Sequence, residues 1–331
     1  MPEKKERIFW IDLYRILVIL LVTINHVPPR MADVFHDWNH YLVITPSFFL
    51  SGYCFNSGAT KTFWNYFKKK CKTLLRPTLV FFFFFYLLWL LGGKMLAHDE
   101  QVEWYKPLME MAIGRPFTIT APMWYVIALV VMQPIYFLLT KFIPEKYILP
   151  ISLVVGCVSS ILPVPKFWQI DQVLLFMPVY ALGARFRKDE TVQQIPFVVL
   201  LLGCAIGIAT FWYCEYDSTP YLLALSPFIM VFTFTFAKVL MCITQWYDHT
   251  LPHYKWMSLV GGNTIILLAA QNYVIGVLKL ALDHVLHTQG FLENNAILKV
   301  PVGILVIILL YPLVHFIVNH IPWILGKEKK Q

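Results

Sequence analysis

The sequence is poor in charge and lacks the short motifs of several common enzyme classes. Only 14% of its 331 residues are Asp, Glu, Lys or Arg, against about a quarter in soluble domains. It contains no HExxH zinc motif, no phosphate-binding P-loop and no glycine fingerprint of a dinucleotide-binding fold. These absences argue against a soluble metalloprotease, a P-loop nucleotidase and a nicotinamide-dependent dehydrogenase.

Cysteine is also sparse, and its spacing indicates neither a disulfide framework nor a zinc site. The six cysteines form no CxxC pair, and most fall in apolar runs, where a free thiol behaves as a small hydrophobe. We therefore expect no metal. The first apolar run lacks a small-residue cleavage site and is followed by Pro28-Pro29-Arg30, which predicts a retained signal anchor rather than a cleaved signal peptide.

Long apolar runs are what the sequence has in abundance. Hydrophobic residues make up 58% of the chain, aromatic residues make up 16%, and the mean hydropathy is +0.63. A membrane-spanning helix needs about 20 mostly apolar residues. We therefore predict an all-α polytopic membrane protein with a single domain over residues 1–331. About ten transmembrane helices are expected, near residues 8–27, 40–58, 74–96, 122–143, 147–163, 171–187, 195–213, 220–244, 257–280 and 298–320.

Lysine and arginine are distributed unevenly over the loops between these runs. With ten helices, the basic clusters near residues 4–7, 61–76, 141–146, 185–188 and 327–330 all fall on one side. The longest opposite loop, 94–121, carries four acidic residues. The positive-inside rule then places both termini in the cytoplasm of a cell-membrane protein. Topology thus accounts for the net charge of +8, and we expect membrane lipids rather than nucleic acid as partners.

The first apolar run, RIFWIDLYRILVILLVTINHV at residues 7–27, carries Asp12, Arg15 and His26. Ionisable residues inside a membrane helix are costly and usually functional. At about 100° per residue, Arg15 and His26 return to within about 20° of the same helix face, about 16 Å apart along the axis. Asp12 precedes Arg15 by three residues and is close enough to pair with it. The alternative interpretation is a structural ion pair and an interfacial histidine.

Six stretches of the sequence, in order, carry a family resemblance. They are W-I-D-L-x-R with His26 following after ten residues, PSFFLSGY at 46–53, KKKCKTLLRP at 68–77, MWY at 123–125, MPVYALGARFRK at 177–188 and GGNTIILLAAQNYV at 261–274. Together they resemble the acyltransferase-3 family of membrane acyltransferases over nearly the whole chain. One departure is Gln271 and Asn272, which stand where many relatives have a histidine. An amide can bind a sugar hydroxyl but cannot act as a base, so the departure suggests a different acceptor.

The resemblance implies O-acyl transfer, usually of acetyl, from cytoplasmic acetyl-CoA to a hydroxyl of a cell-surface polysaccharide or a lipid-linked glycan, as in exopolysaccharide biosynthesis. His26 would be the catalytic residue, either as the base or as the carrier of the acyl group. Asp12 would hold Arg15, and Arg15 would face the donor's phosphates or the thioester oxygen.

The resemblance also implies binding residues for the donor and the substrate. Besides Arg15, the basic side chains expected to bind acetyl-CoA are Lys69, Lys70, Arg76, Arg185 and Arg187. The positive-inside rule explains these residues equally well. The expected substrate contacts are Ser51, Tyr53, Trp124, Gln271 and Asn272. Helix packing through Ser51-Gly52 is an alternative role for Ser51.

A glycan transporter or flippase is the alternative function. Transporters often have repeated halves with paired broken helices, and this sequence has no such repeat. A non-catalytic partner of a polysaccharide synthase is a third interpretation, and the intact Arg15 and His26 pair argues against it. The sequence leaves open whether the chain forms a homo-oligomer or acts with a polysaccharide-synthesis partner.

Overall fold

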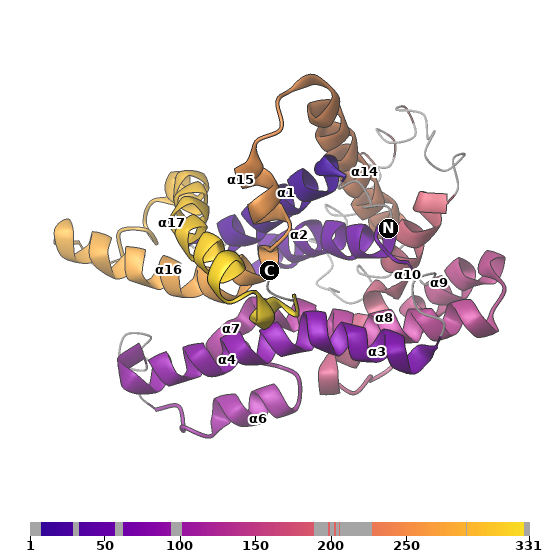
Figure 1. Cartoon of the computed structure of the whole chain (residues 1–331), viewed down its shortest axis with the longest axis horizontal. Helices are drawn as coiled ribbons and strands as arrows, with labels where there is room; N and C mark the ends of the chain where they lie inside the picture. Colours follow the sequence, from indigo (N-terminus) through magenta and orange to yellow (C-terminus); the bar gives the residue numbers. More distant parts are fainter. Residues whose placement is uncertain are drawn as a thin grey trace.

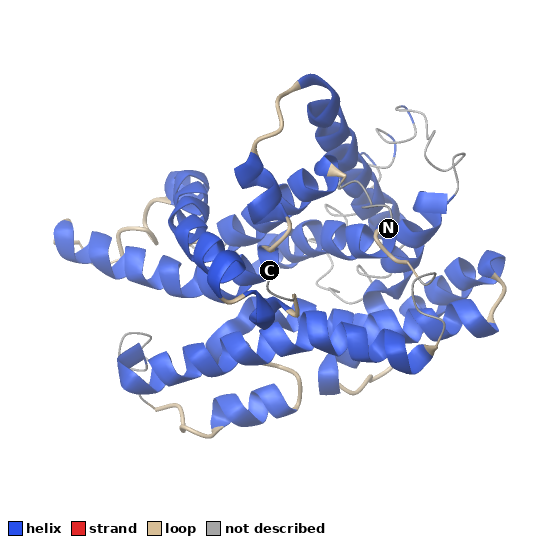
Figure 2. Cartoon of the chain, in the orientation of Figure 1, coloured by secondary structure: helices blue, strands red, loops and turns tan. Residues whose placement is uncertain are grey.

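The fold is built from helices (Figure 1). The computed structural model describes residues 8–28, 33–56, 62–93, 101–188, 227–288 and 290–327, together with 198, 202 and 205. Every regular element in these residues is helical (Figure 2), which confirms the predicted all-α class. The predicted membrane helix at 195–213 lies outside the described residues, apart from those three single positions.

Helices coincide with the other nine predicted membrane segments. They are α1 Phe9–His26, α2 Asp33–Tyr53, α4 Arg76–Leu88, α8 Trp124–Phe142, α9 Glu145–Ile161, α10 Ile170–Lys188, α14 Pro227–Thr250, α16 Thr264–Val285 and α17 Lys299–His320. Shorter elements join them: α3 Phe63–Lys70, α6 Lys106–Ala112, α7 Phe117–Thr120, α15 Lys255–Gly261, two π-helices (η1 Cys71–Leu75 and η2 Trp89–Gly93), and the 3₁₀ turns η3 Ala121–Met123, η4 Phe167–Gln169, η5 Ala296–Leu298 and η6 Pro322–Leu325.

Five helical segments of the described chain are long and apolar enough to cross a membrane. They are Phe9–His26, Phe63–Gly93, Phe117–Phe142, Thr264–Val285 and Ala296–His320. These correspond to the first, third, fourth, ninth and tenth predicted segments, so the chain is a membrane protein. The number of ten spans and the cytoplasmic placement of both termini stay predictions.

The segment 94–121, predicted as a loop, contains two helices. α6 lies under α4 in Figure 1, and the Tyr86 hydroxyl of α4 donates to the Trp104 carbonyl at 2.9 Å. The Glu110 carboxylate of α6 accepts hydrogen bonds from the backbone N–H and the hydroxyl of Thr118 in α7, both at 2.8 Å. These helices are too short and too polar to produce a long apolar run, so the sequence pattern did not predict them.

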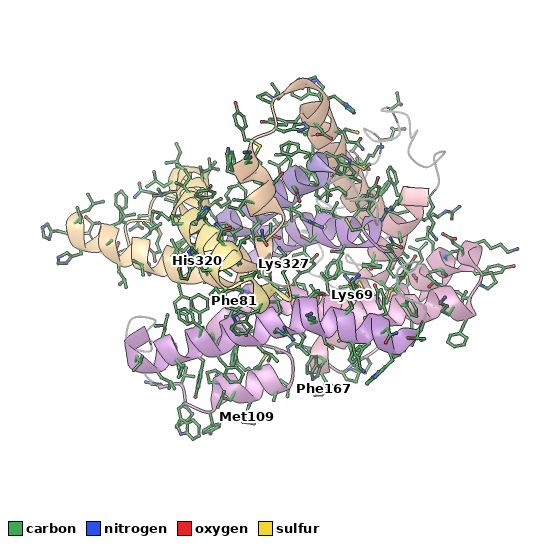
Figure 3. All side chains as sticks on the ribbon, in the orientation of Figure 1. Lys69, Phe81, Met109, Phe167, His320 and Lys327 are labelled. Carbon is green, nitrogen blue, oxygen red and sulfur yellow. The ribbon has the colours of Figure 1, made fainter. Side chains whose placement is uncertain are left out.

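The N-terminal helix α1 occupies the middle of the helix bundle. It contacts α2, α14, α15, α16 and α17, and Figure 1 shows it beside α2. Side chains fill the spaces between these helices (Figure 3). Tyr14 of α1 is fully buried, and its hydroxyl lies 3.3 Å from the Ala237 carbonyl of α14 and 3.4 Å from the Pro46 carbonyl of α2. Residues of α1 are therefore held in place from several sides.

Two glycines allow α2 and α10 to approach each other backbone to backbone. A Cβ at Gly52 of α2 would overlap the Tyr180 carbonyl of α10, and a Cβ at Gly183 of α10 would overlap the Phe49 carbonyl of α2. Small residues at such crossings are how membrane helices pack closely.

We expect Gly52→Ala to lower the thermal unfolding temperature of the detergent-solubilised protein, because the added methyl group forces the two helices apart at a cost of about 1–3 kcal/mol. Gly276→Ala is the matched control, since a Cβ at Gly276 of α16 meets no atom within 4 Å. Equal unfolding temperatures for the two variants would show that the α2–α10 crossing tolerates a side chain.

Candidate active site

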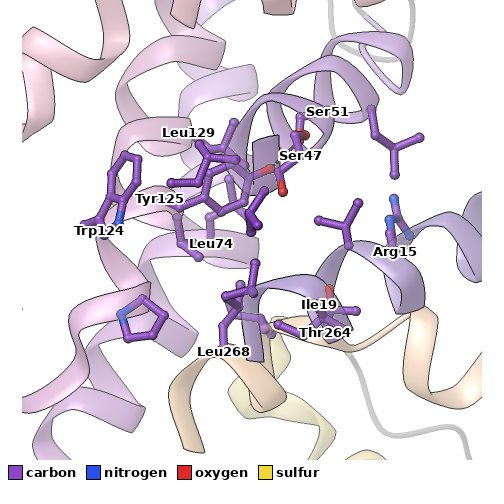
Figure 4. Close-up of a pocket in the computed structure, with 18 of the residues that line it drawn as sticks. Arg15, Ile19, Ser47, Ser51, Leu74, Trp124, Tyr125, Leu129, Thr264 and Leu268 are labelled. Atoms are coloured by element: carbon purple, nitrogen blue, oxygen red, sulfur yellow. Dashed lines mark hydrogen bonds between the residues drawn. The ribbon is translucent and has the colours of Figure 1, made fainter. Parts of the chain in front are cut away.

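A cavity of about 900 Å³ lies among α1, α2, α8 and α16 (Figure 4). Arg15 and His26 both line it, so the two residues that share a face of α1 also share one continuous space. Because they are eleven residues apart in one helix, the cavity extends over about 16 Å between them. Its polar lining side chains include Ser47, Ser51, Cys54, Lys70, Thr73, Trp124, Tyr125, Gln133 and Asn272.

An ion pair orients the arginine at one end of this cavity. Asp12 and Arg15 lie 3.6 Å apart between Oδ1 and Nη1, and the Asp12 side chain is only 4% exposed, whereas that of Arg15 is 37% exposed. The second guanidinium nitrogen, Nη2, lies 3.9 Å from the Cys54 sulfur. Asp12 therefore contacts the buried side of the guanidinium and leaves its other side open to the cavity.

His26 lies at the other end, as the last residue of α1. Its side chain is exposed and belongs to the cavity wall, together with the preceding Asn25. Pro122 and Trp124, from the start of α8 and the turn before it, line the same cavity. The imidazole can thus meet a ligand inside the cavity and one arriving from outside it.

Two hydrogen-bonded hydroxyl groups, those of Ser51 and Tyr125, lie on the cavity wall. The Tyr125 hydroxyl of α8 donates to the Ser47 carbonyl of α2 at 2.9 Å and lies 2.8 Å from the Ser51 hydroxyl. Since the single proton of Tyr125 is used for Ser47, Ser51 is the donor in the second bond. Figure 4 shows Ser47, Ser51 and Tyr125 grouped together. Tyr125 was missed as a site residue, although the MWY motif contains it.

The two amides at the position of the expected late histidine have different surroundings. Gln271 is fully buried, and its Oε1 lies 2.6 Å from the Thr23 hydroxyl of α1, which lies 2.8 Å from the Ile19 carbonyl. Asn272 lines the cavity, and its buried Oδ1 has no hydrogen-bond partner among the described residues. Gln271 therefore joins α16 to α1, and Asn272 is the amide available to a ligand.

The basic residues expected to bind the donor are not gathered at the cavity. Lys70 lines it, with its Nζ 5.1 Å from the centre of the Tyr66 ring. Lys69 is exposed, and Arg185 of α10 is half-buried; among the described residues, neither lines the cavity. Arg76 donates to the Trp323 carbonyl at 3.4 Å.

Arg187 and Tyr53 also have contacts outside the cavity wall. Arg187 donates to the Tyr53 carbonyl at 3.3 Å and to the Phe55 carbonyl at 3.5 Å, which caps the end of α2. The Tyr53 ring packs edge-on against Trp10, with 5.2 Å between ring centres. Trp124 and Ser51 do line the cavity, as expected for substrate contacts.

Two buried polar groups on the wall were not anticipated from the sequence. Gln133 of α8 is 7% exposed, and Tyr180 of α10 is fully buried. Neither Gln133 Oε1 nor the Tyr180 hydroxyl has a hydrogen-bond partner among the described residues, yet both side chains line the cavity. A buried acceptor left unpaired costs about 1–3 kcal/mol, so such groups usually meet a ligand or water. A glutamine in the apolar run of α8 is the signal that could have drawn attention to this position.

Comparison with known proteins identifies the family of this chain. No curated protein and no solved structure matches the chain. The family model described as an acyltransferase domain, that of the acyltransferase-3 family, matches residues 8–315 and so includes every element of the cavity. The chain belongs to the acyltransferase-3 family and is a membrane acyltransferase.

Proposed function

We propose that this enzyme transfers an acyl group, most simply acetyl, from acetyl-CoA to a hydroxyl of a cell-surface polysaccharide or a lipid-linked glycan. The observation that carries the proposal is the single cavity that joins Arg15 to His26. A donor with its charged end at Arg15 and its thioester near His26 would lie along the cavity for about 16 Å. Acetyl-CoA suits this span because a long, flexible pantetheine arm separates its phosphates from its thioester.

This distance favours one of the two roles expected for Arg15. The backbone positions of Arg15 and His26 lie about 16 Å apart along α1, too far for the Arg15 guanidinium to bind a thioester oxygen beside the His26 imidazole. Arg15 therefore binds the phosphates of the donor, for which its planar fork of N–H donors is suited. Asp12 orients the guanidinium of Arg15, and Asp12 itself does not line the large cavity.

The unpaired polar groups on the cavity wall support acetyl-CoA as the acyl donor. Gln133 Oε1 needs a hydrogen-bond donor, and the pantetheine arm carries two amide N–H groups. Gln133 lies nine residues after Trp124 in α8, about 13 Å along the helix from the His26 end. An amide of the arm is therefore expected there while the thioester lies near His26.

The acceptor would bind at the His26 end. Asn272 Oδ1 can accept a hydrogen bond from a sugar hydroxyl, and Trp124 offers an aromatic face for a sugar ring. Both residues line the same cavity as His26. A sugar acceptor in the cavity would therefore have a polar and an aromatic contact besides the imidazole.

The proposed chemistry uses His26 as a general base and then as an acid. The imidazole takes the proton of the acceptor hydroxyl, whose oxygen attacks the thioester carbon and forms a new C–O bond. The tetrahedral oxyanion then collapses and breaks the C–S bond. The imidazolium returns its proton to the departing sulfur, which leaves free CoA, an O-acyl ester and a neutral His26.

The transporter alternative loses its basis once the family is known. Membership of the acyltransferase family implies a transfer reaction. A carrier would also have no need for a general base at one end of its pathway.

We expect His26→Ala to abolish transfer of label from acetyl-labelled CoA to the glycan fraction in membranes that contain the enzyme, because general base catalysis contributes about 10²–10⁴-fold. CoA binding by purified protein should persist. His315→Ala is the control, since His315 is an exposed residue of α17 whose ring lies 3.0 Å from Asn319. Undiminished labelling by His26→Ala would remove His26 from the reaction.

We expect Gln133→Leu to raise KM for acetyl-CoA by roughly 3–10-fold, which corresponds to the loss of one hydrogen bond between the enzyme and acetyl-CoA. The same change should not lower the unfolding temperature of the unliganded protein, because it replaces an unpaired buried amide with an apolar group of similar volume. A lower unfolding temperature with an unchanged KM would indicate a structural role instead.

A further inference from the structure

The C-terminal segment folds back toward the beginning of the chain. After α17, the turn η6 follows, and the exposed Lys327 donates to Asn263 Oδ1 at 2.5 Å. Arg76 holds the turn through the Trp323 carbonyl. Gly326 has φ +70°, and a Cβ there would lie 2.5 Å from the Lys72 carbonyl, so only glycine makes this turn without strain. We name residues 321–327 the C-terminal strap.

Lys327, the last residue of the strap, lines a second, more open cavity of about 350 Å³. Its lining residues are Ile8, Ile11, Asp12, Arg15, Cys54, Gly262 and Lys327. Three of them, Arg15, Cys54 and Gly262, also line the large cavity. The open cavity is therefore a vestibule at the Arg15 end. Figure 3 shows Lys327 near the middle of the molecule, whereas Lys69 lies on the long rod formed by α3 and α4.

The charges around the vestibule favour an anionic ligand. Lys327 and Arg15 contribute two positive charges, and the one acidic lining residue, Asp12, is paired with Arg15. A lysine ammonium and a guanidinium together suit a phosphate group, one as a point charge and the other as a fork. Two of the other basic candidates, Arg76 and Arg187, do not line the vestibule and donate to backbone carbonyls.

We propose that Lys327 of the C-terminal strap binds the phosphate groups of the acyl donor in the vestibule, opposite Arg15. This inference rests on the proposed function, because it takes a CoA thioester as the donor. The strap lies beyond residue 315, where the match to the acyltransferase domain ends, so the assignment comes from this chain's own structure. It places the nucleotide end of the donor at the vestibule and leads the pantetheine arm past Arg15 and Cys54 into the large cavity.

The test is calorimetric binding of CoA to the full-length protein in neutral detergent. We expect Lys327→Gln to raise the Kd of CoA about tenfold, the value of one charge-assisted contact. Glutamine keeps a donor for Asn263, and Lys327→Arg keeps the charge and should restore most of the affinity. Lys146→Ala, an exposed residue of α9, is the control. The difference between Lys327→Gln and the native protein should shrink at high salt, which a purely structural role would not produce.

The outcomes separate this inference from the proposed function. If Lys327→Gln binds CoA as tightly as the native protein does, Lys327 does not bind the donor, and the proposed function still stands. Native protein that binds no CoA overturns both. A third arm adds phosphatidylglycerol to the detergent. Lys327→Gln could leave the affinity for CoA in neutral detergent unchanged and alter only how strongly this anionic lipid competes with CoA. In that case Lys327 binds a lipid headgroup, and the inference fails.

Discussion

The burial of one carboxylate in an apolar helix is the constraint on which the rest of the structure depends. Asp12 is enclosed, and an enclosed carboxylate without a partner is strongly destabilising. Arg15 pairs with this carboxylate through one side of its guanidinium, and the other side faces the cavity. The pair thus holds a cation in a fixed position, and a CoA donor can use that cation without first ordering it.

The surrounding helices maintain this geometry through contacts that tolerate little change. Gly261 of α15 lies so close to the Asp12 backbone that a Cβ would overlap it, and Gly52 brings α2 equally close to α10. Thr23 joins α1 to Gln271 of α16 by a short hydrogen bond. The cavity is therefore bounded by helices whose spacing is set at particular residues, while its unpaired groups, Gln133 and Asn272, remain available to ligands.

The sequence predicted the features that depend on local spacing. Helical periodicity places Arg15 and His26 on one face, and both line the same cavity. The apolar runs located nine helices of the described chain, and six ordered motifs identified the family. The roles assigned to the individual site residues stay proposals, as do the donor and the acceptor.

Features that depend on distant parts of the chain could not be read from spacing. Thr23 and Gln271 are 248 positions apart, and Lys327 reaches the vestibule only because a glycine turn reverses the strap. Basic residues near the ends of helices looked alike in sequence, yet Arg187 caps α2 while Lys70 lines the cavity. The π-helix η1, which carries Thr73 and Leu74 onto the cavity wall, has the composition of an ordinary helix and is distinguished only by its hydrogen bonding.

An experimental structure with an unreactive thioether analogue of acetyl-CoA would show whether one molecule of donor spans the cavity from Arg15 to His26. We expect density for the phosphates at Arg15, for the pantetheine arm along Ser51 and Gln133, and for the acyl carbon beside the His26 imidazole. An analogue bound with its acyl carbon at the Arg15 end, or wholly outside the cavity, would show that the donor does not span the cavity in this way.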